Sequence, residues 1–213
     1  NPKLIMASIS AFGHTGPATN HVAYGANIEA SCGLSAVMGY ADEARPYHTG
    51  MFYADPITAT HTVVAILAAL QHRERTGEGQ YVDLALEENG IIFFAEPVIE
   101  YQVTGEMPER RGNRHRLFAP QGCYPSMGDD SWVVICVRSD DEWDRLVLLI
   151  GNQELADSRL ETLEGRRACH DRIDKILAEW TTQFDHHECA ALLQGKGIAA
   201  APVLENWEMV SNL

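Results

Sequence analysis

The chain has 213 residues, a formal net charge of -14 at pH 7 and 46% hydrophobic residues. This composition is ordinary for a globular protein of one or two domains. The excess of carboxylates disfavours binding to nucleic acid or to anionic lipid surfaces. No apolar run approaches the ~18 residues that a membrane-spanning helix needs, so we expect no membrane span.

The cysteines bear on the cellular compartment of the protein, and the first residues bear on whether the chain is part of a longer one. Five cysteines lie far apart, without a C-x-x-C pair: Cys32, Cys123, Cys136, Cys169 and Cys189. Their odd number argues against a disulfide framework, and we expect a cytoplasmic protein. The chain starts at Asn1-Pro2 with neither an initiator methionine nor a signal-peptide pattern, so we expect a fragment of a longer protein.

The first half of the chain predicts a unit of strand, helix and strand. Residues 4–10 are mostly apolar and stop at a glycine-rich stretch, which is typical of a buried strand. Residues 24–38 show helical spacing. A clearer apolar stripe follows Asp55 and ends before Gly77, with Pro56 predicted at the first helical position and Asp55 as the N-cap. Residues 80–86 alternate as a strand, and this order is that of a parallel sheet.

The second half predicts a small α+β domain. A helix is predicted from residue 87 to about residue 102, and the Gly-, Pro- and Arg-rich residues 103–120 predict a linker. Strands at 122–125 and 132–137 flank turn residues and predict a hairpin. Apolar periodicity then predicts helices at 139–150, 166–180 and 185–194, followed by a returning strand at 200–204.

Several segments, in this order and spacing, resemble the family III CoA-transferases, the CaiB/BaiF or formyl-CoA transferase-like family. Each segment alone is weak evidence, because a Thr-Gly-x-Gly-Gln motif is only a tight turn before a strand. Their combination covers nearly the whole chain. The segments are residues 9–17 (ISAFGHTGP), Tyr24-Gly25, Asp55, and residues 65–70, 73–80, 111–113, 119–125 and 197–203.

The resemblance implies an α/β fold in two parts. Residues 1–102 would form part of a large Rossmann-like, parallel-sheet domain that binds CoA and carries the catalytic aspartate. Residues 103–120 would be the linker, residues 121–204 the small α+β domain, and residues 205–213 the start of the return to the large domain. The resemblance also implies an interlocked homodimer, in which each chain threads through the other, and further chain on both sides of this fragment.

The resemblance implies an acyl-CoA:carboxylate CoA-transferase that moves CoA between small carboxylic acids. In the family, the aspartate that introduces this alanine-rich helix forms the covalent intermediate, and Asp55 stands in that place. Acyl-CoA would be a substrate, and no metal is expected. Backbone N–H groups next to Asp55 could hold the negative charge that develops on the thioester oxygen. The alternative is that Asp55 only caps the helix, a contribution of about 1 kcal/mol.

The resemblance also implies two sets of binding residues. His21, Val22, Ala23 and Tyr24 would line the CoA site; the alternative is a surface loop that enters a helix. Gln121 and Gly122 match a loop that covers the acyl-aspartyl intermediate in formyl-CoA transferase. This stretch is less glycine-rich here, and the alternative is a turn that links the domains.

Two other functions remain open at this point. The 2-methylacyl-CoA racemases share the fold but need a histidine near the place of Tyr24 to move the α-proton. A phenol with a pKa near ~10 is a poor base for this step, which favours transfer over racemisation. His21 could take the role only if the alignment slips by three residues. The other function is that of a non-catalytic interaction module.

Two charged or metal-ligating clusters also have alternative interpretations. The arginines in residues 110–116 could face CoA phosphates or pair with the protein's own carboxylates, and we favour self-pairing. His186, His187 and Cys189 resemble a metal site only superficially. Neighbouring histidines would point to different helix faces, so we predict no metal there.

Overall fold

The computed structural model describes residues 1–211 and has a mixed α/β fold, as predicted. The chain forms two compact units, Asn1–Gly112 and Asn113–Leu213, each with its own sheet. The border between the units falls within the linker predicted at residues 103–120. Across residues 1–211, every helix is either too short or too polar to span a lipid bilayer.

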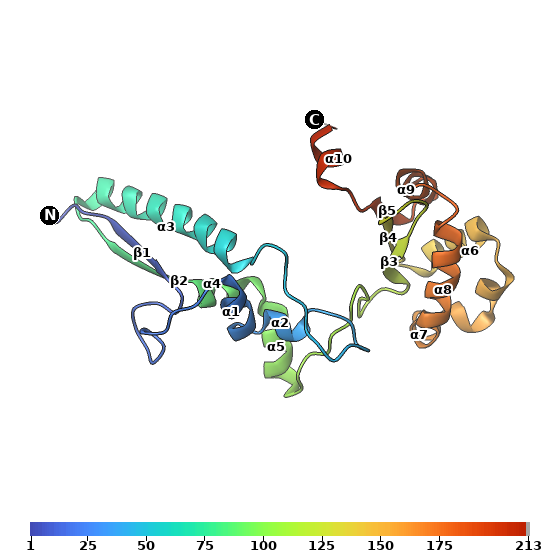
Figure 1. Ribbon diagram of the computed structural model, residues 1–213, viewed down its shortest axis with the longest axis horizontal. Coiled ribbons are helices and arrows are strands. Elements are labelled where there is room, and N and C mark those ends of the chain that lie inside the picture. Colours follow the sequence, from blue (N-terminus) through green and yellow to red (C-terminus); the bar gives the residue numbers. More distant parts are fainter. Residues whose placement is uncertain (212–213) are drawn as a thin grey trace. The chain divides into compact units, whose positions relative to one another are not determined.

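The first unit contains a parallel strand pair with a long helix beside it. Strands β1 (Met6–Ser10) and β2 (Tyr81–Ala85) pair in parallel over their full lengths, with Met6 opposite Tyr81. Helix α3 (Ala54–Thr76) connects them along the chain and lies against both strands (Figure 1). The predicted order of strand, helix and parallel strand is therefore confirmed.

The predicted start of α3 was wrong by two residues. Tyr53 is the N-cap and Asp55 is the second residue of the helix, while Gly77 ends it in the left-handed region with φ 81°. Pro56 fits its place because the N–H groups of the first turn need no acceptor within the helix. The proline therefore did not mark the first helical position.

Two predicted helices of the first unit are each split in two. Residues 24–38 form α1 (Gly25–Ser31) and α2 (Leu34–Val37), separated at Gly33, whose φ is 91°. Residues 86–104 form α4 (Leu86–Phe93) and α5 (Ala95–Thr104), with a non-helical backbone at Phe94. The apolar spacing continues across both breaks, so periodicity alone did not reveal them.

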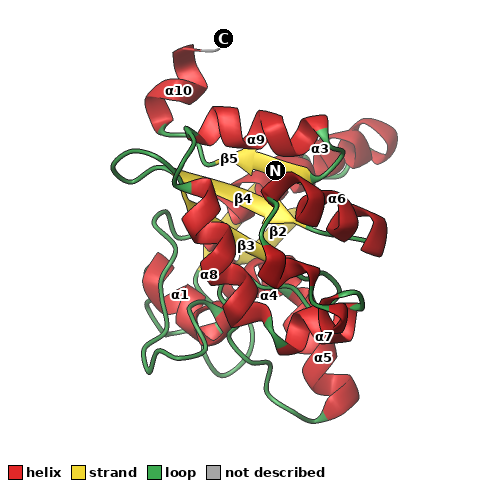
Figure 2. Ribbon diagram, turned by 90° about the vertical axis from the view of Figure 1, so that its right-hand side faces the viewer, coloured by secondary structure: helices red, strands yellow, loops and turns green. Residues whose placement is uncertain are grey.

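The second unit is an antiparallel sheet covered by helices, in the order β3-β4-β5 (Figure 2). Its strands are β3 (Gln121–Pro125), β4 (Trp132–Cys136) and β5 (Ala199–Pro202), so the predicted hairpin and returning strand are confirmed. The predicted helix at 166–180 is divided at Cys169, and the helix at the C-terminal end was not predicted. The helical segments are α6 (Asp140–Ile150), η1 (Gln153–Ala156), η2 (Ser158–Leu160), α7 (Leu163–Ala168), α8 (His170–Thr181), α9 (His186–Gly195) and α10 (Asn206–Ser211).

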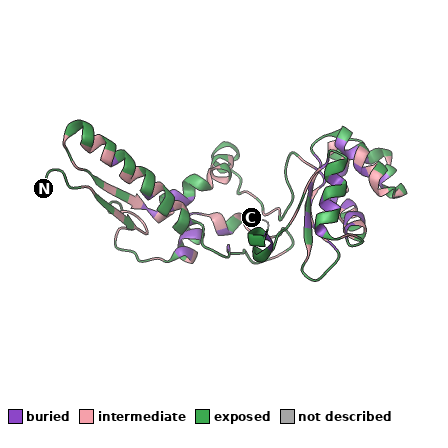
Figure 3. Ribbon diagram, turned by 90° about the horizontal axis from the view of Figure 1, so that it is seen from above, coloured by how far each residue is buried: buried purple, intermediate pink, exposed green. Residues whose placement is uncertain are grey.

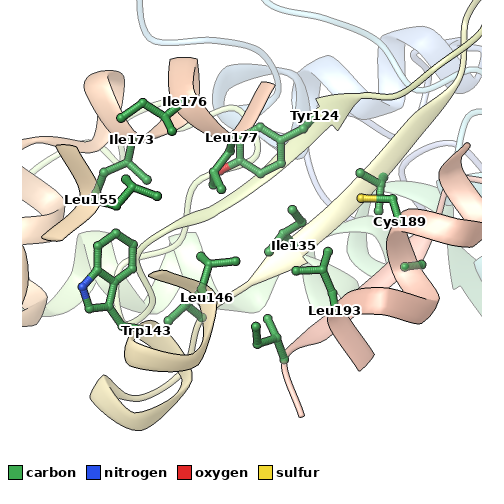
Figure 4. Packing of buried hydrophobic residues seen from close by; sticks show 14 of the residues in the cluster. Tyr124, Ile135, Trp143, Leu146, Leu155, Ile173, Ile176, Leu177, Cys189 and Leu193 are labelled. Atoms are coloured by element: carbon green, nitrogen blue, oxygen red, sulfur yellow. The ribbon is translucent and has the colours of Figure 1, made fainter. Parts of the chain in front are cut away.

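The hydrophobic core of the second unit lies between its sheet and its helices (Figure 4). Alternate residues of β4 point inward, and Ile135 belongs to one buried cluster with Trp143 and Leu146 of α6 and Leu193 of α9. The N-cap Ser139 accepts a hydrogen bond from the Glu142 N–H, which fixes the start of α6. The sheet and helix faces thus bury each other's apolar side chains.

The first unit has no comparable cluster among the described residues. Its buried apolar side chains are few, with Ile28 fully buried and Cys32 nearly so. Helix α3 instead exposes Val63, Val64 and Leu67, each to more than half of its area, and the helix is largely exposed in Figure 3. The first unit therefore leaves much apolar surface uncovered.

Candidate active site around Asp55

The Asp55 carboxylate lies at the start of α3, beside the start of α1. A Cβ atom added to the buried Gly25 would be 3.0 Å from Asp55 Oδ2 and 2.5 Å from Phe52 Cβ. Because carbon atoms in contact are normally about 3.5–4.0 Å apart, only glycine fits at this point. The two helix starts are thus in direct contact through Gly25.

This contact brings Asp55 close to the predicted CoA segment. Gly25 directly follows His21, Val22, Ala23 and Tyr24, and Tyr24 is the N-cap of α1. Val22 and Tyr24 are 88% and 79% exposed, so their apolar surface is open to a ligand. The His21 ring meets Phe12 edge to face, with ring centroids 6.1 Å apart.

The Asp55 side chain is exposed and has no hydrogen bond or ion pair with any residue from 1 to 211. An aspartate that caps a helix accepts a hydrogen bond from a backbone N–H of the first turn. Asp55 accepts none and is not the N-cap, so the interpretation of this residue as a simple cap is wrong. Its carboxylate oxygens are available to a substrate.

A buried carboxylate that the sequence analysis missed holds the start of α3. Glu29 of α1 is 1% exposed, and its carboxylate accepts hydrogen bonds from the Tyr53 N–H at 3.0 Å and the Thr49 N–H at 3.3 Å. The Thr49 hydroxyl also donates to it, and His48 Nδ1 lies 3.6 Å away. The one available signal was that Glu29 is the only charged residue in the sequence of α1.

The first turn of α3 offers few backbone donors for a thioester oxygen. The Tyr53 N–H donates to Glu29, the Asp55 N–H donates to the Phe52 carbonyl at 3.0 Å, and Pro56 has no N–H. The Ile57 N–H donates to Tyr53. Among residues 53–57, only the Ala54 N–H remains, so an oxyanion site cannot consist mainly of this turn.

Gln121 and Gly122 lie at the start of strand β3, within the second unit, and not in a loop. The Gln121 amide donates to the Asn113 carbonyl at 3.3 Å and accepts from the Cys136 thiol at 3.3 Å. A Cβ atom on Gly122 would be 2.7 Å from the Tyr124 hydroxyl oxygen. Both residues are held by the sheet, and their contact with a substrate stays a prediction.

Two arginines of the cluster, Arg111 and Arg114, pair with the protein's own carboxylates, as we favoured. Arg114 bridges Asp171 at 2.5 Å and Asp174 at 2.6 Å, and Arg111 lies 3.5 Å from Glu100. The Tyr124 hydroxyl donates to Asp174 at 2.8 Å, and burial, together with this carboxylate, raises the pKa of Tyr124 well above its usual range. The two paired arginines are therefore poor candidates for binding CoA phosphates.

Cysteine is a less suitable nucleophile than Asp55 in this chain. All five cysteines are free thiols. Burial raises the pKa of Cys32, Cys123 and Cys136, and it raises the pKa of Cys189 to about 11. Because the thiolate is the reactive form, a raised pKa makes these four thiols weaker nucleophiles at neutral pH than an ordinary cysteine.

The family is established by comparison with known proteins. Residues 1–212 match the family described as CoA-transferase family III. The chain belongs to this family. The resemblance drawn from residues 9–17, Asp55 and the later segments is therefore confirmed.

Relatives of this family III chain include named CoA-transferases. The chain is 34% identical over 213 residues to a succinyl-CoA–D-citramalate CoA-transferase of Chloroflexus aurantiacus, with 100% of this chain and 52% of that protein covered. It is 30% identical to a succinate–glutarate CoA-transferase of Agrobacterium fabrum, with the same coverage. A CaiB/BaiF family protein from Brucella suis has a TM-score of 0.91 and 32% identity, over 99% of this chain and 55% of that one. The chain spans about half the length of these relatives.

Proposed function

We propose that the protein is an acyl-CoA:carboxylate CoA-transferase that works through a covalent intermediate on Asp55. The proposal is carried by one observation: the Asp55 carboxylate has no partner within residues 1–211 and lies against Gly25, which follows the predicted CoA residues His21 to Tyr24. Family membership and the relatives named as CoA-transferases support it.

The proposed reaction uses one carboxylate as a carrier. An Asp55 oxygen attacks the thioester carbonyl carbon, the carbon–sulfur bond breaks, and a mixed anhydride and the CoA thiolate form. The thiolate attacks the Asp55 side-chain carbonyl carbon, which gives an aspartyl-CoA thioester and releases the donor acid. The acceptor carboxylate attacks this thioester to form a second anhydride and free thiolate. The thiolate then attacks the acyl carbon, so that the new acyl-CoA leaves and Asp55 is regenerated.

Water must be kept from both anhydrides, because hydrolysis would waste the donor thioester. Asp55 is exposed in this chain, so we infer that the bound CoA, a second subunit or other parts of the protein cover it during the reaction. Val22 and Tyr24, in the segment that leads into Gly25, offer exposed apolar surface for such contacts. Gln121 and Gly122 remain candidates for contact with the acyl group.

We propose small dicarboxylic acids as the first substrates to test. The names of the relatives include succinyl-CoA with D-citramalate, succinate with glutarate, and succinyl-CoA with mesaconate. Tyr24 in the place where the racemases need a histidine favours transfer over racemisation.

The experiment uses the full-length parent protein. Isotope-labelled CoA is followed between succinate and glutarate, and the intermediate is trapped with hydroxylamine or borohydride and located by mass spectrometry. We expect the trapping reagent to modify Asp55. An Asp55→Asn variant should lose both CoA transfer and this modification. Asp42→Asn, which removes an exposed carboxylate elsewhere in the first unit, is the matched control. Exchange of the substrate α-proton with deuterated water would instead indicate a racemase, and neither activity would indicate an interaction module.

We further propose that the protein forms an interlocked homodimer and resides in the cytoplasm. The exposed apolar side chains of α3, Val63, Val64 and Leu67, support a covering partner. Two relatives are named as alpha and beta subunits of a succinyl-CoA–L-malate CoA-transferase. Light scattering of the full-length protein tests the assembly, and a monomer at micromolar concentration would contradict it.

A further inference from the structure

Three metal-ligating side chains converge in the second unit, in a place that the proposed transfer reaction does not use. His186 and His187 are the first two residues of α9, and Glu208 lies in α10 (Figure 1). Glu208 Oε1 is 3.0 Å from His186 Nε2 and 2.9 Å from His187 Nε2. The three ligand atoms lie within 4.8 Å of one another.

The expectation that the two histidines point to different helix faces was wrong. Side chains in a helix lean toward its N-terminus, over the preceding turn. His186 and His187 have no preceding turn, so both rings are free to lean beyond the end of the helix. Their centroids are 4.4 Å apart, and both Nε2 atoms reach the same Glu208 oxygen.

Further hydrogen bonds orient two of these side chains. His186 is buried, and its Nδ1 lies 2.9 Å from Ser131 Oγ, which is 2.8 Å from Ser126 Oγ. The second oxygen of Glu208 accepts a hydrogen bond of 2.7 Å from the Glu205 N–H. Metal-binding histidines and carboxylates are usually held in this way by a second group. These hydrogen bonds fix the positions of His186 and Glu208, whose Nε2 and Oε1 atoms lie 3.0 Å apart.

The surroundings of the cluster are acidic. The pocket beside it has a volume of about 450 Å³, and the described residues that line it include no lysine or arginine. Four carboxylates contribute to its wall, and a cation would be attracted to it. These carboxylates belong to Asp130, Asp185, Glu205 and Glu208.

We propose that His186, His187 and Glu208 bind one divalent first-row transition-metal ion, with Zn²⁺ the best match. Two imidazole nitrogens and one carboxylate oxygen suit zinc, whereas Mg²⁺ and Ca²⁺ prefer oxygen ligands alone. Tetrahedral zinc with bonds of about 2.0–2.2 Å places its ligand atoms roughly 3.3 Å apart. The spacing at Glu208 is already close to this value.

Binding requires that both Nε2 atoms present a lone pair. In the metal-bound form His186 carries its proton on Nδ1 and donates it to Ser131 Oγ, which lies 2.9 Å away. His187 is about half exposed, so solvent can accept the proton on its Nδ1. The fourth position is left to a water molecule. The ion would connect α10 to the start of α9, at a place that is independent of Asp55.

The test is a calorimetric titration of tag-free, chelator-treated protein with ZnCl₂. We expect one Zn²⁺ per chain, with saturable binding lost in His187→Gln and Glu208→Gln. Ser131→Ala should weaken binding by about 10- to 100-fold, because it removes the hydrogen bond that orients His186. Substitution of Co²⁺ should give the visible absorption of a tetrahedral site, absent in His187→Gln.

The matched controls are Glu188→Gln and His72→Gln. Glu188 is an exposed carboxylate in the same first turn of α9, and His72 lies in the first unit, in α3. Both variants should bind Zn²⁺ as the unchanged protein does. His187 is half exposed, so its replacement should leave the fold intact by circular dichroism. Absence of saturable binding, or equal binding by the unchanged protein and His187→Gln, would overturn the proposal.

Discussion

Gly25→Ala tests whether the contact between α1 and α3 sets the position of Asp55. The added Cβ would lie 2.5 Å from Phe52 Cβ and 3.0 Å from Asp55 Oδ2. Normal carbon contacts of about 3.5–4.0 Å then require a shift of roughly 1 Å between the two helix starts. Overpacking of this kind typically costs about 1–3 kcal/mol of folding stability.

The same shift should slow catalysis. A misplacement of about 1 Å in a reacting group can lower a rate about 100-fold. We therefore expect kcat/KM for CoA transfer to fall by about two orders of magnitude in Gly25→Ala, which corresponds to roughly 2.7 kcal/mol of transition-state stabilisation. The assay is transfer of labelled CoA by the full-length protein, with the unfolding midpoint measured in parallel.

Gly50→Ala is the matched control, because a Cβ at Gly50 meets no atom within 4 Å. This variant should retain activity and stability. If Gly25→Ala keeps full activity while Asp55→Asn is inactive, Asp55 is still required for transfer, but the contact at Gly25 does not set its position. If neither variant changes transfer, the proposed function itself is refuted.

Three further predictions concern stability and pH. Glu29→Ala should lower the free energy of unfolding by about 1–3 kcal/mol for each buried donor left without an acceptor, measured by urea denaturation; an unchanged midpoint would contradict the role of Glu29 at the start of α3. Leu146→Ala should cost about 2–5 kcal/mol, whereas Leu148→Ala on the same helix, where the side chain is 82% exposed, should cost little; equal losses would show that the core assignment is wrong. Burial lowers the pKa of His170 below 6.5, so the unfolded chain binds the proton more readily and stability should fall as the pH drops below about 6.5. A melting series from pH 7 to 5 should show a smaller decline in His170→Gln, and an identical decline would exclude this cause.

The sequence determined those elements whose signals are local. Alternation in residues 80–86, the turn residues between 122–125 and 132–137, and the long stripe after Asp55 predicted strands and a helix that the structure contains. The breaks at Gly33, Phe94 and Cys169 were missed, because apolar spacing continues through them. Of the three breaks, only the one at Gly33 had a signal in the sequence, namely the glycine itself. Its φ of 91° lies in the left-handed region, which glycine adopts readily.

The resemblance placed Asp55 at the start of a long helix, but only the tertiary structure decided what surrounds it. The approach of Gly25, the burial of Glu29 under Thr49 and Tyr53, and the meeting of His186 with Glu208 all join residues more than 15 positions apart. Helical and strand periodicity reports only which face of an element is apolar. Which polar group meets which depends on how the elements pack, and the local sequence does not encode that arrangement.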